Sequence, residues 1–420
     1  NSISGKGGKK SKMQAAEESY RRALADRPDV FSLSAFAQFL VDVGREEEAI
    51  TYFERALAAE DATRSKETLG LTLGWYAALL EEKGRDEKAR AEELYKQALR
   101  LNPQDPLAMG NYAVFLHRIK LDKQAAKIAY DVAVKTHPSH ASIICKYGCF
   151  AKHVLKDYDK ARQLFEKAIE ANPVHAESLG NLAVLLHGQQ LTKQSEINLV
   201  EDLYKRATHA DPMNVNTLSN YGLFLAEVCK DVKGAERLYK TAAAIDPGHA
   251  NSIYNYAVLL DSGLKMTKRA EDMYRRCLDV NPRHSYALYN LAVLREEHAP
   301  DGNYSETKQL YERAIESNPT DALTLADYGR FLAAVEKDFH GATANLRAAL
   351  HLDPNCTTAL FNLGKLILQQ SVQGPRRLPR GASMGSTLSE AKYLLLRAVK
   401  GKRDHPGANL CLARMLKDEG

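Results

Sequence analysis

The chain has 420 residues, of which 45% are hydrophobic and 26% are charged. This balance is typical of a folded protein and excludes wholesale disorder and collagen-like structure. The 58 Lys and Arg residues exceed the 53 Asp and Glu residues by only five charges, so charge alone gives no reason to expect a nucleic-acid partner. No apolar run approaches the roughly 20 residues of a membrane-spanning helix, and we therefore expect no membrane partner.

Six cysteines occur without a CxxC pair or a regular spacing. Such a pattern is a poor disulfide framework and fits a reducing compartment. We therefore expect free thiols and an intracellular protein, with the cytoplasm as the predicted compartment. At the start of the chain, residues 1–12 contain GKGGKKSK, which predicts a flexible basic tail.

From residue 13 onward one phrase recurs, as in ELYKQALRLNP, RQLFEKAIEANP and ERLYKTAAAIDP. Its large apolar anchor comes in chain order at Tyr20, Phe53, Tyr95, Tyr130, Phe165, Tyr204, Tyr239, Tyr274, Tyr311, Leu346 and Leu395, and five of the ten intervals are 35 residues. A small residue stands four positions before almost every anchor and three positions after it. These offsets place all three side chains on one stripe of a helix, here called helix B. Proline follows nine of the anchors by eight residues and should end helix B.

A second small residue lies about eighteen positions after most anchors, inside phrases such as NYAVFL and NLAVLL. It is always Gly or Ala, at Ala37, Ala77, Ala113, Gly148, Ala183, Gly222, Ala257, Ala292, Gly329, Gly364 and Ala413. These apolar phrases predict a second helix, helix A, so that the repeating unit is a pair of helices. One pair cannot bury both of its faces, and neighbouring pairs must stack to form a continuous core.

The period and the placement of small residues, aromatic anchor and closing proline resemble the tetratricopeptide (TPR) repeat. The chain departs from the family in its period of 35 rather than 34 residues and in the near absence of Trp at the start of helix A. The resemblance implies an all-α, right-handed solenoid superhelix with the A helices lining its concave face. We expect about eleven helix pairs, forming a single solenoid over residues 13–420.

Insertions lengthen the pattern near residues 60–70, 187–200 and 369–390. The last contains Arg376, Arg377 and Arg380 among Gly, Pro and Ser, a composition that predicts a mobile solvent-exposed loop. The repeats begin with a B helix and close with an A helix, and the first residue is not Met. This order predicts a fragment of a longer protein.

One polar position recurs two residues before the small residue of helix A. It holds Asn111, Asn181, Asn220, Asn255, Asn290 and Asn362, with Lys146 and Asp327 in the same register. An Asn side chain offers an acceptor and donors that match the backbone of an extended peptide. The TPR regions of O-linked N-acetylglucosamine transferases look similar, which implies peptide binding through this ladder. The alternative is that these side chains bond to neighbouring helices.

Aromatic side chains stand one residue before the ladder at Tyr254, Tyr289 and Phe361, where they are expected either to anchor a hydrophobic partner or to pack between helices. Three residues after it stand mostly apolar residues, Val114, Cys149, Val184, Leu223, Val258 and Val293. Only Lys146 supplies a basic group at the ladder, which argues against the paired cations that some TPRs use to bind C-terminal carboxylates.

Two recurring patterns suggest metal sites but do not complete one. His140, His175, His249 and His284 follow the proline by two residues, but separate repeats should hold them about 10 Å apart, so a helix N-terminal cap or loop packing is the favoured interpretation. Cys145, Cys149 and His153 are spaced four apart on one helix, yet they lack the fourth ligand of a structural zinc site. No cofactor or metal is predicted.

The chain shows no nucleophile elbow, phosphate-binding glycine loop or HExxH motif, so it is not predicted to be an enzyme. The predicted function is a scaffold that binds an extended or helical segment of a protein partner. Two alternatives stay open: the recognition arm of a larger enzyme such as a glycosyltransferase, and an RNA-binding helical-repeat protein. A nearly neutral, mostly apolar groove disfavours RNA.

Overall fold

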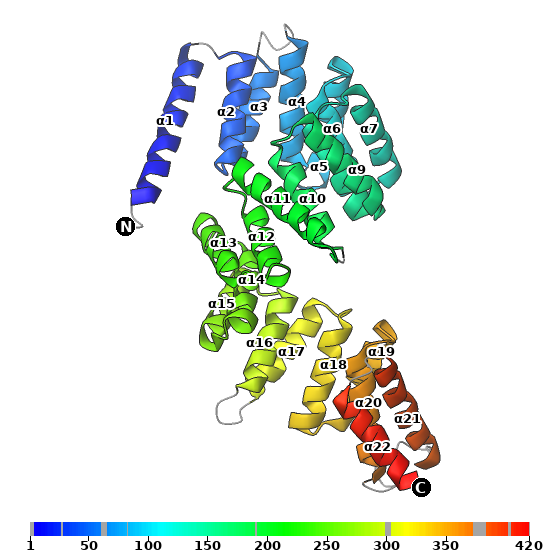
Figure 1. The fold of residues 1–420 in the computed structure, drawn as a ribbon. Helices are drawn as coiled ribbons and strands as arrows, with labels where there is room; N and C mark the ends of the chain where they lie inside the picture. Colours follow the sequence, from blue (N-terminus) through cyan, green and yellow to red (C-terminus); the bar gives the residue numbers. More distant parts are fainter. Residues whose placement is uncertain are drawn as a thin grey trace. The chain divides into compact units, whose positions relative to one another are not determined.

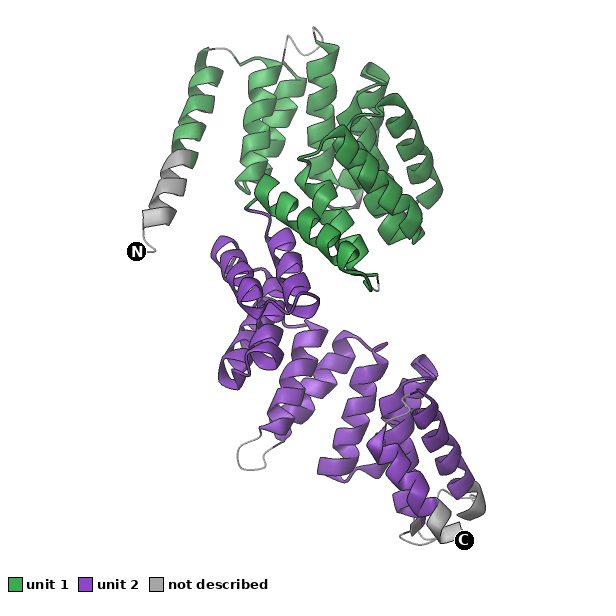
Figure 2. Ribbon diagram, viewed as in Figure 1, with its two compact units in different colours: residues 1–212 green, residues 213–420 purple. Residues whose placement is uncertain are grey.

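The computed structural model describes residues 4–419 except 27, 60–64, 82, 190, 299–303, 373–383 and 402–404, and every regular element within these residues is helical (Figure 1). The chain forms two compact units, residues 1–212 and 213–420, each described by itself (Figure 2). None of the described helices is both long enough and apolar enough to cross a membrane.

Unit 1 is a series of paired helices. It contains α1 (Ser4–Asp26), α2 (Val30–Asp42), α3 (Glu46–Leu57), α4 (Lys66–Leu80), α5 (Arg85–Leu101), α6 (Pro106–Arg118), α7 (Lys123–Thr136), α8 (Ala141–Phe150) continued by the π-helical turn η1 (Ala151–Leu155), α9 (Tyr158–Ala171), α10 (Ala176–His187) and α11 (Gln194–Ala210). The even-numbered helices are the predicted A helices and the odd-numbered ones the B helices.

Unit 2 continues the same alternation. It contains α12 (Val215–Glu227), α13 (Val232–Ile245), α14 (Ala250–Val258) continued by η2 (Leu259–Gly263), α15 (Thr267–Val280), α16 (Ser285–Glu297), α17 (Ser305–Ser317), α18 (Ala322–Phe331) continued by η4 (Leu332–Glu336), α19 (Phe339–Leu352), α20 (Thr357–Val372), α21 (Met384–Gly401) and α22 (Pro406–Glu419). The prediction of an all-α repeat of helix pairs is confirmed.

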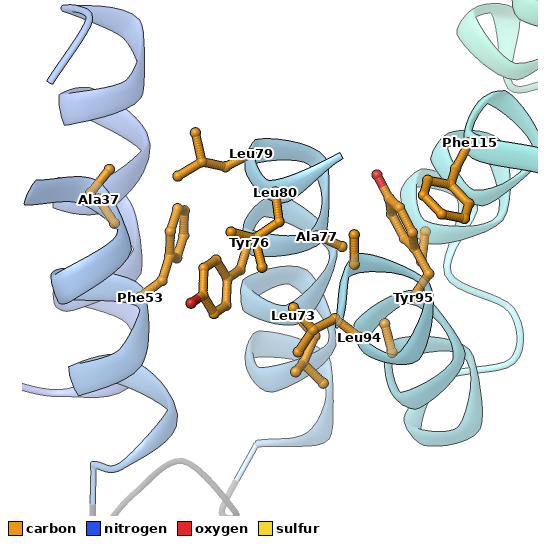
Figure 3. Packing of buried hydrophobic residues seen from close by; sticks show 14 of the residues in the cluster. Ala37, Phe53, Leu73, Tyr76, Ala77, Leu79, Leu80, Leu94, Tyr95 and Phe115 are labelled. Carbon is orange, nitrogen blue, oxygen red and sulfur yellow. The ribbon is translucent and has the colours of Figure 1, made fainter. Parts of the chain in front are cut away.

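The anchors of helix B form the core. All of them from Phe53 to Leu395 are buried, whereas Tyr20 in the first repeat is half-buried. In unit 1 the ring of Phe53 stacks on that of Tyr76, with 5.4 Å between the ring centroids, and the Tyr95 and Phe115 ring centroids lie 5.7 Å apart (Figure 3). Aromatic pairs at such separations bury large apolar areas between successive helices. The core therefore runs from pair to pair, as stacking of incomplete units requires.

The small residues of helix A leave room for these anchors. A Cβ added to Gly148 would lie 2.6 Å from the ring of Phe165, and one added to Gly222 would lie 2.9 Å from Tyr239. Real Cβ atoms do not approach other atoms so closely, so the small side chain is what lets helix B approach.

The turns are defined by caps. Helix α9 ends at Ala171, directly before Asn172 and Pro173, as the proline pattern predicts. Between helices A and B, Lys156 adopts a left-handed conformation with φ 57°, and Asp157 then caps α9 by accepting from the backbone N–H of Lys160 at 3.0 Å. Lys and Asp stand in the same two roles at residues 230–231 and 337–338. Asp caps of this kind stabilise a helix start by about 1 kcal/mol.

Helices extend further than the sequence predicted. Helix α11 begins at Gln194, so much of the insertion at 187–200 is helical, because Glu196 accepts from the backbone N–H groups of Thr192 and Lys193 at 3.1 Å each and caps the longer helix. The expected loop at 369–390 is likewise helical up to Val372 and from Met384, and the expected tail is helical from Ser4. Arg376, Arg377 and Arg380 lie outside the described residues, as do residues 60–64 of the insertion at 60–70.

Candidate partner-binding face

The ladder residues lie on consecutive A helices. In unit 1, Asn111, Lys146 and Asn181 lie on α6, α8 and α10; in unit 2, Asn220, Asn255, Asn290, Asp327 and Asn362 lie on α12, α14, α16, α18 and α20. All eight side chains are half-buried. We call the A-helix surface that carries these residues and the residues three positions later the ladder face.

Neighbouring ladder residues bond directly in unit 1. The Nζ of Lys146 donates to Oδ1 of Asn111 at 2.7 Å. Burial lowers the pKa of Lys146, while the negative charge of Glu177 opposes that shift. On the next helix, Nδ2 of Asn181 donates to Sγ of Cys149 at 3.3 Å and to Sγ of Cys145 at 3.7 Å. The side chains of α6, α8 and α10 are thus linked in sequence.

In unit 2 the amide donors also bond to the preceding A helix. Nδ2 of Asn255 donates to Oγ of Ser219 at 3.1 Å, and Nδ2 of Asn290 donates to the hydroxyl oxygen of Tyr254 at 3.0 Å. In each case the acceptor stands 36 residues earlier, one position before the preceding ladder residue. The amide nitrogens of Asn181, Asn255 and Asn290 therefore bond to neighbouring helices, which was the alternative to peptide binding in the sequence analysis.

In each of these three amides the nitrogen forms a hydrogen bond within the described chain, whereas the oxygen does not. No described residue donates to Oδ1 of Asn181, Asn255 or Asn290, and none of these oxygens is among the buried atoms without a partner. In these three repeats one amide acceptor is therefore not used by the described chain. An amide oxygen can accept from a backbone N–H group of an extended segment.

Three ladder asparagines depart from this scheme, the first being Asn111, whose Oδ1 accepts from Nζ of Lys146. Asn362 donates to the backbone oxygen of Thr358 on its own helix at 2.9 Å. Asn220 makes no side-chain hydrogen bond with any described residue. Asn220 consequently has both donors and its acceptor available.

The aromatic residues beside the ladder each contact the next repeat. The Tyr289 hydroxyl donates to Oδ2 of Asp327 at 2.7 Å, and burial raises the pKa of Tyr289, with the bond to Asp327 adding to the shift. The Tyr254 ring lies 4.9 Å from His284, and the Phe361 ring lies 4.5 Å from His405. All three aromatic side chains are half-buried, so they pack between repeats and keep part of their surface on the ladder face.

The residues three positions after the ladder change character within unit 2. Leu223, Val258 and Val293 are apolar and half-buried, and the next three repeats place Arg330, Lys365 and Arg414 in the same register. Sequence reasoning followed this column only as far as Val293 and so missed the change. Extending the same register to the end of the chain would have found it.

These three cations line a pocket of about 590 Å³ formed by α18, η4, α19, α20 and α22. Asn362, Gln369 and Gln370 add amide groups, Lys337 adds a fourth cation, and none of the described lining residues is acidic. Arg330 is committed to Glu296, to which it donates twice, at 2.6 and 2.8 Å, and this bond raises the pKa of Arg330. Lys365 and Arg414 are exposed and form no ion pair with another described side chain.

The recurring histidines mostly cap helices, as predicted. The Nδ1 atoms of His175, His249 and His284 accept from the backbone N–H groups of Ser178, Ser252 and Ala287 at 3.2 to 3.3 Å. The His140 side chain makes no cap bond: its ring packs against His137 and its Nδ1 is buried without a partner, while the His140 backbone oxygen accepts from Ile143 and Ile144. His153 lies on η1 and is exposed, and partial desolvation of its ring lowers its pKa.

Three family models described as tetratricopeptide repeat match the chain, at residues 75–141 with 155–196, at 286–321, and at 32–63. The chain carries tetratricopeptide repeats. These matches agree with the helix pairs, buried anchors and proline-terminated B helices described above. No curated protein matches the sequence significantly.

Among solved structures, this TPR chain is similar to the human IFIT1 dimer with m7Gppp-AAAA, with a TM-score of 0.59 and 15% identity over 92% of this chain and 90% of that one. It is also similar to YrrB, described as a TPR protein with an unusual peptide-binding site, with a TM-score of 0.36 and 23% identity over 47% of this chain and 98% of that one. Yeast Tom70 matches with a TM-score of 0.43 and 16% identity, over 93% of this chain and 88% of the Tom70 chain. At these identities the IFIT1 match supports the fold alone.

Proposed function

We propose that this TPR chain is a protein-interaction scaffold whose ladder face binds an extended segment of a protein partner. The amide oxygens of Asn255 and Asn290 on successive A helices of unit 2, and that of Asn181 in unit 1, support this proposal, because their nitrogens are used within the fold and their oxygens are not. Each net hydrogen bond to a partner would contribute about 0.5 to 1.5 kcal/mol, less the cost of ordering the segment. The partly exposed apolar column would contribute contacts beside these bonds.

The observation that carries the proposal furthest is the change from apolar to basic residues in unit 2. A segment lying along α12 to α22 would meet Leu223, Val258 and Val293 and then the pocket of Arg330, Lys365 and Arg414. Such a sequence of surfaces is complementary to an apolar stretch followed by acidic residues. The preferred ligand is therefore a peptide that carries both in that order or its reverse.

The test uses fluorescence anisotropy with the full chain and labelled twelve-residue peptides. One peptide has an apolar half and an acidic half, a second has a basic half in place of the acidic one, and a third is a scrambled version of the first. We expect the first to bind at least tenfold more tightly than the second. Equal affinity of all three would contradict the proposal.

Charge reversal locates the binding. In the variant Lys365→Glu/Arg414→Glu, affinity for the apolar-acidic peptide should fall by tenfold or more, because two exposed cations of the pocket become anions. The matched control is Arg237→Glu/Lys268→Glu, which makes the same charge change at exposed positions on B helices of unit 2. If both variants lose affinity equally, binding depends on net charge rather than on the pocket.

RNA is the competing ligand class, since a basic pocket attracts phosphate and the IFIT1 structure contains a capped RNA fragment. The apolar column favours a protein segment, because RNA recognition uses stacking and cations along the whole track. A single-stranded RNA oligonucleotide of matched length belongs in the same titration. Tighter binding of this RNA than of the peptide would overturn the proposal.

A further inference from the structure

Two thiols and a carboxylate meet on the ladder face of unit 1. Sγ of Cys145, Sγ of Cys149 and a carboxylate oxygen of Glu177 all lie within 4.8 Å of one another. The cysteines occupy positions one turn apart on α8, and Glu177 lies in the first turn of α10, which packs against α8. From these contacts we infer that Cys145, Cys149 and Glu177 form a site for a thiophilic divalent cation, with Zn²⁺ as the probe.

The separations are close to those that a metal requires. Zn²⁺ binds thiolate sulfur at about 2.3 Å and carboxylate oxygen at about 2.0 to 2.2 Å, so two sulfurs on one tetrahedral ion lie about 3.8 Å apart. A closing movement of about 1 Å or less would bring the three ligand atoms into place. Glu177 is exposed and can make this movement without disturbing the core, whereas Cys145 is buried and fixed.

A hydrogen-bond donor reaches both sulfurs, as is usual around metal-bound thiolates. Nδ2 of Asn181 donates to both sulfurs, at 3.3 and 3.7 Å. The His175 ring interacts electrostatically with Cys145, while its Nε2 lies 3.1 Å from Oγ of Ser142 and its Nδ1 accepts the cap bond from Ser178. Donors in this outer shell orient thiolates and offset part of their charge.

The charge around the site fits a divalent cation. Two thiolates and one carboxylate bring three negative charges, and Zn²⁺ would leave one uncompensated. Lys152 interacts electrostatically with Cys149, and Lys146 does so with Glu177. Three protein ligands leave the fourth coordination position for water, on the side where Glu177 is exposed. His153, which the spacing of the sequence suggested as a third ligand, is not in the group that the structure brings together.

The test is a titration of the reduced full chain with Co²⁺ and Zn²⁺. We expect one Co²⁺ per chain, with the near-ultraviolet charge-transfer absorption of cobalt–thiolate bonds, and displacement of Co²⁺ by an equivalent of Zn²⁺. Cys149→Ser should abolish this absorption, and Glu177→Gln should weaken Zn²⁺ binding by about tenfold or more. Circular dichroism should show the same helix content in both variants.

The matched control is Cys277→Ala, because Cys277 is a buried thiol at a position where ten other repeats hold Ala. It removes one thiol and should leave metal binding unchanged. Failure of the wild-type chain to give the charge-transfer absorption would overturn the inference, and so would equal loss in Cys149→Ser and Cys277→Ala. The readout does not involve peptide binding, so it is independent of the proposed function.

Discussion

Asn290 on α16 donates through Nδ2 to the hydroxyl oxygen of Tyr254 on α14, at 3.0 Å and across 36 residues of sequence. One amide therefore joins two repeats through its nitrogen and leaves its oxygen to a group outside the described chain. Under the proposed function, the structural role of the ladder belongs to the amide nitrogen and the binding role to the amide oxygen of the same side chain. This division makes the two roles separable by mutation.

Asn290→Ala should lower the free energy of unfolding by about 0.5 to 1.5 kcal/mol, since it removes a hydrogen bond between helices. Asn220→Ala should leave that free energy within about 0.5 kcal/mol of the wild type, because Asn220 bonds to no described residue. Both variants should weaken binding of the apolar-acidic peptide. Chemical denaturation and fluorescence anisotropy provide the two measurements. Loss of stability in Asn290→Ala without loss of binding would show that the ladder is structural only.

Gly148→Ala tests the close approach of helix B. The added Cβ would lie 2.6 Å from the Phe165 ring, so we expect a loss of about 1 to 3 kcal/mol from overpacking. Gly74→Ala is the matched control, because Gly74 also lies in an A helix of unit 1 and its added Cβ would meet nothing within 4 Å. That variant should be neutral or more stable by up to about 1 kcal/mol, the helix-propensity gain of Ala over Gly. Equal effects in urea denaturation would argue against the packing explanation.

The buried face of helix B could be predicted from sequence, because its residues are close together in the chain and recur with the helical period. A residue such as Tyr239 is flanked by Ala235 and Ala242 in sequence, and the 3.6-residue period places all three on one face. The all-α fold and the order of helices followed from this alone. The extension of α11 back to Gln194 was not foreseen, because a loop insertion and a helix extension of equal length look alike unless the cap made by Glu196 is recognised.

The candidate site was harder to predict than the fold. The ladder positions were found by register, yet the partners of their side chains depend on what the preceding repeat offers, such as Ser219 for Asn255 and Tyr254 for Asn290. The approach of Glu177 to Cys145 joins two repeats across 32 residues, and no spacing rule within one helix could have shown it. Contacts between repeats need coordinates, whereas contacts within a helix pair follow from the period.

His284 should make stability depend on pH. Its Nδ1 accepts the cap bond from Ala287, and burial lowers the pKa of His284 from the ordinary value of 6.5. Because the unfolded chain binds this proton more readily than the folded one, the free energy of unfolding should fall as the pH drops below 6.5 and level off below the lowered pKa. The loss should be about 1 kcal/mol, the value of a cap.

His284→Asn isolates this contribution, because Asn214 fills the equivalent position and caps α12 by accepting from Thr217 at 3.0 Å. Asn keeps the cap and does not titrate in this range. Denaturation midpoints of the two proteins, measured from pH 7.5 to pH 5, should converge or cross as the pH falls. Parallel curves would show that His284 does not contribute to the pH dependence.

Arg330 lines the basic pocket and also contributes to stability through its ion pair with Glu296. Its two bonds to Glu296 involve a carboxylate whose side chain is only 13% exposed and which also accepts from the Tyr311 hydroxyl at 3.0 Å. Arg330→Met leaves that carboxylate without its cation, and we expect a loss of about 1 to 3 kcal/mol, below the cost at fully buried pairs because Arg330 is partly exposed. Glu296→Gln/Arg330→Met should recover part of the loss, since the unpaired charge is gone.

Lys365→Met is the control, because it removes a cation of the same pocket that pairs with no described carboxylate. It should change stability by less than about 0.5 kcal/mol and should still weaken binding of the acidic peptide. A double-mutant cycle by chemical denaturation measures the coupling. A coupling energy near zero would mean that Arg330 is available to the partner rather than committed to Glu296.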